Sequence, residues 1–165
     1  MWTILKYDKK YLSFLKSDLS NKVGKDLEFY IPKIKIQKYI KNKLCNFENN
    51  LIGDYLLCNH RSFANSNVIN SLKYCRGVKF FLTNYINDQE GINKFIWKCK
   101  THENKEGYIQ QSFFEFKNIK KSEFISGPFT NLVFNLISEN NKMLNVQIDK
   151  FCVTVPKNSY LFRPV

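Results

Sequence analysis

The hydrophobic pattern of this sequence changes at the polar segment 101–107, and that change limits the possible folds more than any other feature. Before this segment, apolar residues recur alternately at the spacings of strands and of helices. After it, they are confined to short strand-like runs separated by turn-forming residues. Because 165 residues can form two small hydrophobic cores, the pattern predicts two small domains of different architecture.

The first half of the chain is predicted to form an antiparallel sheet with helices packed against it. A helix is predicted between Asp8, a good N-cap residue, and Gly24, a good C-cap residue. The polar segment 41–50 is predicted to be a loop, because it has turn-forming residues and no apolar period. Strands are predicted at 2–7, at 27–39 with a break at Pro32, at 55–58 and at 79–83, and two more helices at 67–74 and 91–100.

The second half is predicted to form a small β-barrel. Its strands are predicted at 120–125, 132–137, 144–148 and 151–155. The overall fold class is therefore α+β: an N-terminal antiparallel sheet flanked by helices, followed by a small barrel. The predicted domain boundaries are 1–102 for the first domain, 103–116 for the linker and 117–165 for the barrel.

The residues that usually carry catalysis or bind metal are scattered in this sequence. The cysteines are odd in number, no two of them form a C-x-x-C pair, and His60 and His102 stand apart from them. Neither a disulfide framework nor a zinc site is expected, and no cofactor is expected. Neither histidine lies near a Cys or Ser nucleophile pattern, and no phosphate-binding glycine loop occurs, so we expect no enzyme activity.

Net charge indicates the class of partner. Lys and Arg outnumber Asp and Glu by 26 to 14, and a net charge of +12 favours binding to nucleic acid. The alternative is that a lysine- and asparagine-rich composition reflects a biased genome. The apolar start of the chain is interrupted at Lys6, and no later run approaches the ~20 apolar residues of a membrane span. We therefore expect a cytoplasmic monomer that does not associate with membranes.

Ordered motifs in both halves resemble the NusG family of transcription elongation factors. The stretch 126–132, Ser-Gly-Pro-Phe-Thr-Asn-Leu, followed by 136–139 and 144–148, is similar to the start of the KOW barrel of that family. In the first half, the similar pieces are Trp2, Tyr30-Ile31-Pro32, the stretch 51–57 and the stretch 76–81. Asp54 and Phe134 stand where most of the family has glycine. The specialised RfaH-like branch also lacks both glycines, so the chain resembles that branch more closely.

The resemblance implies a transcription elongation or antitermination factor that binds RNA polymerase and suppresses pausing. In the family, an apolar patch of the N-terminal domain binds the clamp helices of the polymerase. Tyr55 and Leu57 share one face of a predicted strand, and Phe80 or Phe81 would complete such a patch. The alternative for Leu57, Phe80 and Phe81 is that they belong to the hydrophobic core of the domain. The hydroxyl of Tyr55 favours a position that reaches solvent.

Two further contacts are implied by the resemblance. Asn65, Ser66, Asn67 and Asn70 correspond to residues that touch the gate loop of the polymerase, and the alternative is a helix N-cap. A basic cluster corresponds to residues that face upstream DNA and the non-template strand, the alternative being solvated surface for each member. The cluster comprises Lys9, Lys10, Lys16, Lys73 and Arg76.

The role of the predicted barrel is left open by the sequence. In NusG it binds the termination factor Rho or the ribosome, and in RfaH the same segment can also fold as a helical hairpin. The alternation around Val146 favours a barrel here. An alternative function for the whole chain is that of a ribosome-associated or RNA-binding KOW protein, since such barrels also occur in ribosomal proteins.

Overall fold

A computed structural model of the protein describes residues 1–114 and 121–165. These residues form two compact units, Met1–Pro32 with Asn50–Lys98 and Lys33–Asn49 with Cys99–Val165. The end of the predicted linker, 115–116, and the start of the predicted barrel, 117–120, lie outside the described residues. The domain boundaries given above stay a prediction.

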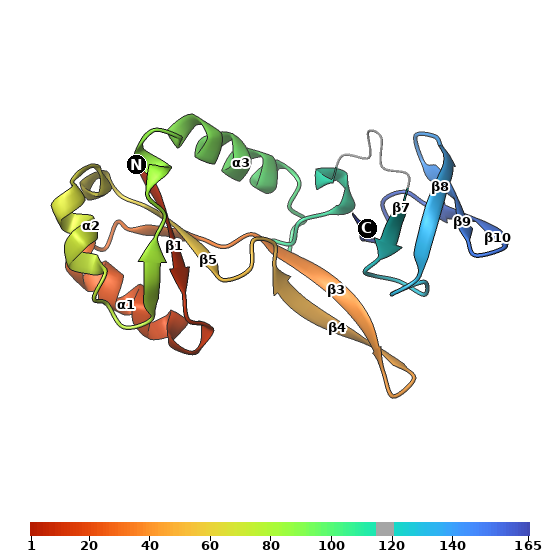
Figure 1. The fold of residues 1–165 in the computed structure, drawn as a ribbon, viewed down its shortest axis with the longest axis horizontal. Helices are drawn as coiled ribbons and strands as arrows, with labels where there is room; N and C mark the ends of the chain where they lie inside the picture. Colours follow the sequence, from red (N-terminus) through yellow and green to blue (C-terminus); the bar gives the residue numbers. More distant parts are fainter. Residues whose placement is uncertain (115–120) are drawn as a thin grey trace. The chain divides into compact units, whose positions relative to one another are not determined.

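The first unit is built on a four-stranded antiparallel sheet in the order β2-β5-β1-β6. Its strands are β1 (Trp2–Tyr7), β2 (Glu28–Tyr30), β5 (Tyr55–Asn59) and β6 (Val78–Phe81). The helices α1 (Leu12–Val23) and α2 (Ser66–Leu72) belong to this unit, as does most of α3 (Gln89–Thr101) (Figure 1). Short 3-10 helices occur at Lys9–Tyr11, Arg61–Ala64 and Asn84–Ile86.

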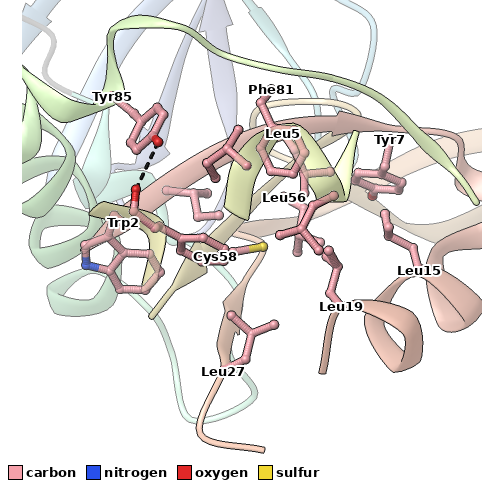
Figure 2. Packing of buried hydrophobic residues seen from close by; sticks show 14 of the residues in the cluster. Trp2, Leu5, Tyr7, Leu15, Leu19, Leu27, Leu56, Cys58, Phe81 and Tyr85 are labelled. Carbon is pink, nitrogen blue, oxygen red and sulfur yellow. Dashed lines mark hydrogen bonds between the residues drawn. The ribbon is translucent and has the colours of Figure 1, made fainter. Parts of the chain in front are cut away.

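The core of this unit forms where α1 packs against the sheet. Tyr7 and Leu56 lie on the same sheet face, beside Leu15 and Leu19 of the helix (Figure 2). All four side chains are at most 1% exposed. Full burial of a leucine contributes roughly 1.5–3 kcal/mol, so this interface holds the helix on the sheet.

The turn before β6 is set by one glycine. Gly77 has a φ of +93°, and a Cβ atom added to it would lie 2.8 Å from Cβ of Tyr11. Its carbonyl accepts a hydrogen bond of 2.9 Å from the main-chain N–H of Asp8. The Arg76-Gly77 turn is therefore held against the start of the α1 segment.

Part of the segment 27–50 differs from the prediction. The break predicted at Pro32 separates β2 from β3 (Lys33–Ile40), but the predicted loop 41–50 is largely strand β4 (Lys43–Asn50). β3 and β4 form a two-stranded hairpin whose turn residues Lys41 and Asn42 have φ values of 49° and 60°. Two successive left-handed residues match the right-handed twist of a hairpin. Most hairpin residues are exposed, so the burial alternation that marks a half-buried strand is missing.

The second unit contains a five-stranded antiparallel sheet in the order β10-β9-β8-β7-β11. Its core consists of Phe124, Phe134, Leu144, Val146, Ile148, Val155 and Phe162. The strands are β7 (Lys121–Phe124), β8 (Val133–Glu139), β9 (Met143–Ile148), β10 (Phe151–Pro156) and β11 (Phe162–Pro164). The predicted α+β class, with a helix-flanked sheet followed by a small antiparallel sheet, is confirmed.

The β3-β4 hairpin belongs to the second unit. The main-chain N–H of Gln37 donates to the carbonyl of Ile125 at 2.8 Å, and that of Ile109 donates to the carbonyl of Lys33 at 2.8 Å. A 3-10 helix at Gln111–Phe113 follows Ile109. Throughout the described residues, the helices are too short or too polar to cross a membrane.

Candidate functional site

An apolar groove lies on the first unit, on the sheet face that carries Ile4 and Leu57. Ile4 of β1 and Leu57 of β5 are cross-strand partners, so both point to this face. Ile92 and Phe95 of α3 line the groove from the helix side, and its volume is about 330 Å³. The remaining lining residues are Ile52, Tyr55, Leu82, Asp88 and Gly91.

A row of two aromatic rings with a lysine between them continues the same sheet face. Lys6 is the cross-strand partner of Tyr55 on one side and of Phe80 on the other. Its ammonium nitrogen lies 5.6 Å from the Tyr55 ring centroid and 5.8 Å from that of Phe80. A cation at this distance from an aromatic face is attracted by the ring quadrupole. The row therefore presents an ordered positive charge beside an apolar hollow.

The structure brings together most of the residues that were predicted to form the apolar patch. Tyr55 and Leu57 both line the groove, although Leu57 is fully buried and also belongs to the core, and Phe80 stands across Lys6 from Tyr55 with 45% of its surface exposed. Phe81 is only 7% exposed and belongs to the core, because its cross-strand partner Leu5 points to the opposite face of the sheet. Phe80 is thus the phenylalanine available to this surface.

The groove also contains residues that the sequence analysis did not assign to it. Ile4 lies in β1 and Leu82 directly follows β6, and apolar residues at such positions could equally belong to a core. Ile92 and Phe95 show the helical i and i+3 spacing of an amphipathic helix, but spacing alone does not say whether that face is fully covered. The helical spacing of Ile92 and Phe95 is visible in the sequence. Whether these side chains line a groove or a closed core depends on the position of α3 over the sheet, which the sequence does not give.

The polar group predicted to touch the polymerase lies at the start of α2. Asn65 caps this helix, and its side-chain oxygen accepts from the main-chain N–H of Asn67 at 2.9 Å. Asn65, Ser66, Asn67 and Asn70 are all exposed. Asn65 therefore has a structural role as an N-cap, and the side chains of Ser66, Asn67 and Asn70 are the ones available to a partner.

Part of the predicted basic cluster converges at the β6 edge of the sheet. The guanidinium carbon of Arg76 lies 4.4 Å from the ring centroid of Tyr11, which directly follows Lys9 and Lys10. Lys9 forms an ion pair of 3.1 Å with Asp54 and keeps 70% of its side chain exposed. Lys9, Lys10 and Arg76, here called the basic edge, thus come from two segments that touch at Tyr11, with the Lys9 ammonium held by Asp54.

The other two predicted basic residues are placed differently. The Lys16 ammonium lies 5.5 Å from the ring centroid of Phe29 in β2, which is the opposite edge strand of the sheet. Lys73 is the exposed C-cap residue of α2, three positions before Arg76 in the sequence. Lys16 is thus separated from the basic edge by the width of the sheet.

His60 connects an acid and a hydroxyl in an arrangement that resembles a catalytic triad. Its Nε2 lies 3.1 Å from Oδ2 of Asp26, and its Nδ1 contacts Oγ of Ser62. The same Nδ1 accepts the main-chain N–H of Ser62 at 3.1 Å, so this nitrogen caps the 3-10 helix Arg61–Ala64. A general base must have its nitrogen free to take a proton, and this one is occupied by a peptide group.

Perturbed pKa values occur at few of the described residues. Burial raises the pKa of the Cys58 thiol and that of the Tyr85 hydroxyl, which donates to the Phe63 carbonyl at 3.0 Å (dashed line in Figure 2). A hydrogen bond from Tyr108, with Lys33 nearby, lowers the pKa of Glu48, and the same bond raises the pKa of Tyr108. The described residues contain no cluster of His, Cys, Asp and Glu suited to a metal ion.

The solved structures to which this chain is similar include two that cover nearly the whole chain. No protein-family model and no curated protein matches the sequence. The crystal structure of the MjSpt4:Spt5 complex, conformation B, is 12% identical over 100% of this chain and 98% of that chain, with a TM-score of 0.29. A structure concerning domain interaction in Thermotoga maritima NusG is 15% identical over 99% of this chain and 96% of that chain, with a TM-score of 0.34.

Proposed function

We propose that this protein is a transcription elongation factor that binds RNA polymerase through the apolar groove and suppresses pausing or termination. Within that class, we assign it to the specialised RfaH-like branch of NusG relatives. The ordered motifs in both halves of the sequence support this proposal. The structural observation that carries it is the groove in which Tyr55 and Leu57 face α3, next to the exposed Phe80.

The chemistry of the groove suits a helix as its partner. An apolar hollow between a sheet and a helix can accept the apolar ridge of an amphipathic helix. Tyr55 offers a large apolar ring with a polar end, which is the type of residue that most often anchors an interface. Asp88 at the groove and Lys6 between the two rings provide charges of both signs for the polar flanks of that helix. The clamp helices of RNA polymerase are the proposed partner.

Two surfaces are proposed to add to this contact. The exposed side chains at the start of α2, Ser66, Asn67 and Asn70, would hydrogen-bond to the gate loop of the polymerase. The basic edge would contact phosphates of upstream or non-template DNA, which adds salt-sensitive affinity with little dependence on sequence. We propose that the protein acts as a cytoplasmic monomer and that the second unit binds Rho or the ribosome.

A single-round transcription assay with core polymerase tests the proposal. We expect the protein to shorten pause lifetimes at saturating concentration and to comigrate with the polymerase in gel filtration. Tyr74→Ala is the control for substitutions at the groove residue Tyr55, because Tyr74 is 89% exposed and does not line the groove. Its activity should equal that of the unmodified protein.

The contrary result is also well defined. Unchanged pause lifetimes together with no comigration with polymerase would overturn the proposal. Comigration with ribosomal particles in the same experiment would instead support a ribosome-associated KOW protein.

A further inference from the structure

A polar cleft of about 360 Å³ lies within the second unit, and none of its lining residues is assigned to polymerase or DNA. It is bordered by the β3-β4 hairpin, the segment 104–111 and the turn before β11. The residues that matter for its chemistry are Lys35, Asn46, Tyr108, Gln111, Ser159 and Tyr160. Two tyrosine rings, two amides, a hydroxyl and an ammonium group thus surround one hollow.

Gln111 has an unused hydrogen-bond donor at this cleft. The residue is 2% exposed, and its Oε1 accepts the main-chain N–H of Phe162 at 2.8 Å. Its Nε2 is buried and has no hydrogen-bond partner among the described residues. A buried donor without a partner is unfavourable, so a ligand atom that accepts a hydrogen bond there would relieve this cost.

The tyrosines of the cleft are held in place before any ligand arrives. The Tyr108 hydroxyl donates to Glu48 of β4, and the Lys35 ammonium lies 5.4 Å from the Tyr108 ring centroid. The Tyr160 ring packs so closely on Gly127 that a Cβ atom there would lie 2.1 Å from it. Restrained rings lose little conformational entropy on binding, which favours stacking with a flat ligand.

From these features we infer that the cleft binds a base of a single-stranded nucleic acid. Stacking on tyrosine suits any base, and the free amide of Gln111 suits a carbonyl oxygen or ring nitrogen. Lys35, whose ammonium lies 3.5 Å from Glu106 in an exposed ion pair, would exchange that carboxylate for the adjoining phosphate. The second unit carries more basic than acidic residues, which attracts such a chain. This inference is independent of the groove on the first unit.

Binding of fluorescein-labelled ten-nucleotide probes, uridine RNA (U10) and thymidine DNA (dT10), tests the inference by anisotropy. Tyr108→Ala should weaken binding about tenfold, since stacking on one aromatic ring has an effect of this size. Tyr108→Phe keeps the ring and should bind within about twofold of the unmodified protein. Tighter binding of U10 would identify RNA as the ligand, and tighter binding of dT10 would identify DNA.

Two lysines provide a charge-matched comparison. Lys35→Gln should weaken binding several-fold more than Lys150→Gln, because Lys150 carries the same charge outside the cleft. Equal losses for the two variants would mean diffuse attraction to the surface and would overturn the inference. Failure of both probes to bind would also overturn it, whatever the protein does with polymerase.

The Gln111 amide gives a readout that does not depend on mutating the tyrosine. In NMR spectra of the isotope-labelled protein, the Gln111 side-chain NH2 signals should shift when U10 or dT10 is added. Gln111→Glu keeps an oxygen for the Phe162 N–H but removes the donor, so it should weaken binding while Lys150→Gln does not. Unshifted Gln111 signals at saturating probe would place the nucleic acid elsewhere.

Discussion

Tyr55 is the residue at which binding and folding can be separated most clearly. It lines the groove and is half-buried, whereas its neighbour Leu56 is fully buried in the core. Tyr55→Ala should therefore weaken polymerase binding by roughly 1–3 kcal/mol, the usual range for an aromatic anchor, and change stability much less. Affinity and melting temperature of the variant measure the two effects.

The matched change at Tyr74, which is 89% exposed, should alter neither quantity. If Tyr55→Ala loses stability in proportion to its loss of affinity, Tyr55 is a core residue and the binding surface lies elsewhere.

Gly77 is a residue at which backbone conformation and crowding act together. Gly77→Ala would combine a φ of +93° with a Cβ atom 2.8 Å from Cβ of Tyr11. We expect a loss of unfolding free energy of more than about 1 kcal/mol, measured by urea denaturation, because a left-handed backbone alone costs about that much for a non-glycine residue.

Gly53→Ala separates the two causes. Gly53 has a φ of +66° and no neighbouring atom within 4 Å of an added Cβ, so this variant should show the backbone cost without the crowding. Equal losses for Gly53→Ala and Gly77→Ala would mean that the contact with Tyr11 relaxes freely and does not hold the turn.

At the scale of elements, the basic edge depends on the contact between the segment before α1 and the turn before β6. The Asp8 N–H bonds to the Gly77 carbonyl, and Arg76 stacks on Tyr11, so the segment that carries Lys9 and Lys10 touches the one that carries Arg76. Neutralising all three to glutamine should lower the slope of log affinity for fork-like DNA against log salt by up to about one unit per lost phosphate contact. Binding to free polymerase should persist.

A charge-matched control is available on the same unit. Lys22, Lys25 and Lys94 are exposed and lie outside the basic edge, and their triple change to glutamine removes the same charge. An equal fall in salt slope for both triple variants would show that DNA attraction is spread over the protein, and the assignment of this edge would be withdrawn.

The elements that could be predicted from the sequence are those with one buried face. β1 and α1 were predicted because their apolar residues recur at the period of a strand and of a helix. β4 was missed because its residues are mostly exposed, so polar side chains occupy both faces of the hairpin. An element with one buried face shows a periodic pattern of apolar residues in the sequence. An element exposed on both faces, such as β4, shows no such pattern.

The same reasoning applies to the candidate site. Tyr55 and Leu57 could be paired from sequence because they are two residues apart on one strand. The choice between Phe80 and Phe81 required the register of β6 against β1, which the bulge between Lys6 and Tyr7 makes irregular. The polar cleft could not be predicted, since Lys35, Tyr108 and Tyr160 are distant in sequence.

At the scale of the whole molecule, the described residues form two separate hydrophobic cores. One contains Leu15, Leu19 and Leu56 among others, and the second is centred on Phe124, Phe134 and Phe162. Each core is made entirely of residues from its own unit. We therefore expect the two units to unfold as two cooperative blocks.

Leu19→Ala tests this expectation by hydrogen exchange. Removing a fully buried leucine should cost roughly 2–5 kcal/mol, and the loss should appear in the slowest amides of β1 and β5. Amides of β8 and β9 should keep their protection, because among the described residues their core is a different cluster from the one that contains Leu19. Val155→Ala is the reciprocal variant and should reduce protection in β8 and β9 but not in β1 and β5. A parallel loss of protection in both sheets with either variant would mean that the chain unfolds as one cooperative block, and each core would then depend on the other for its stability.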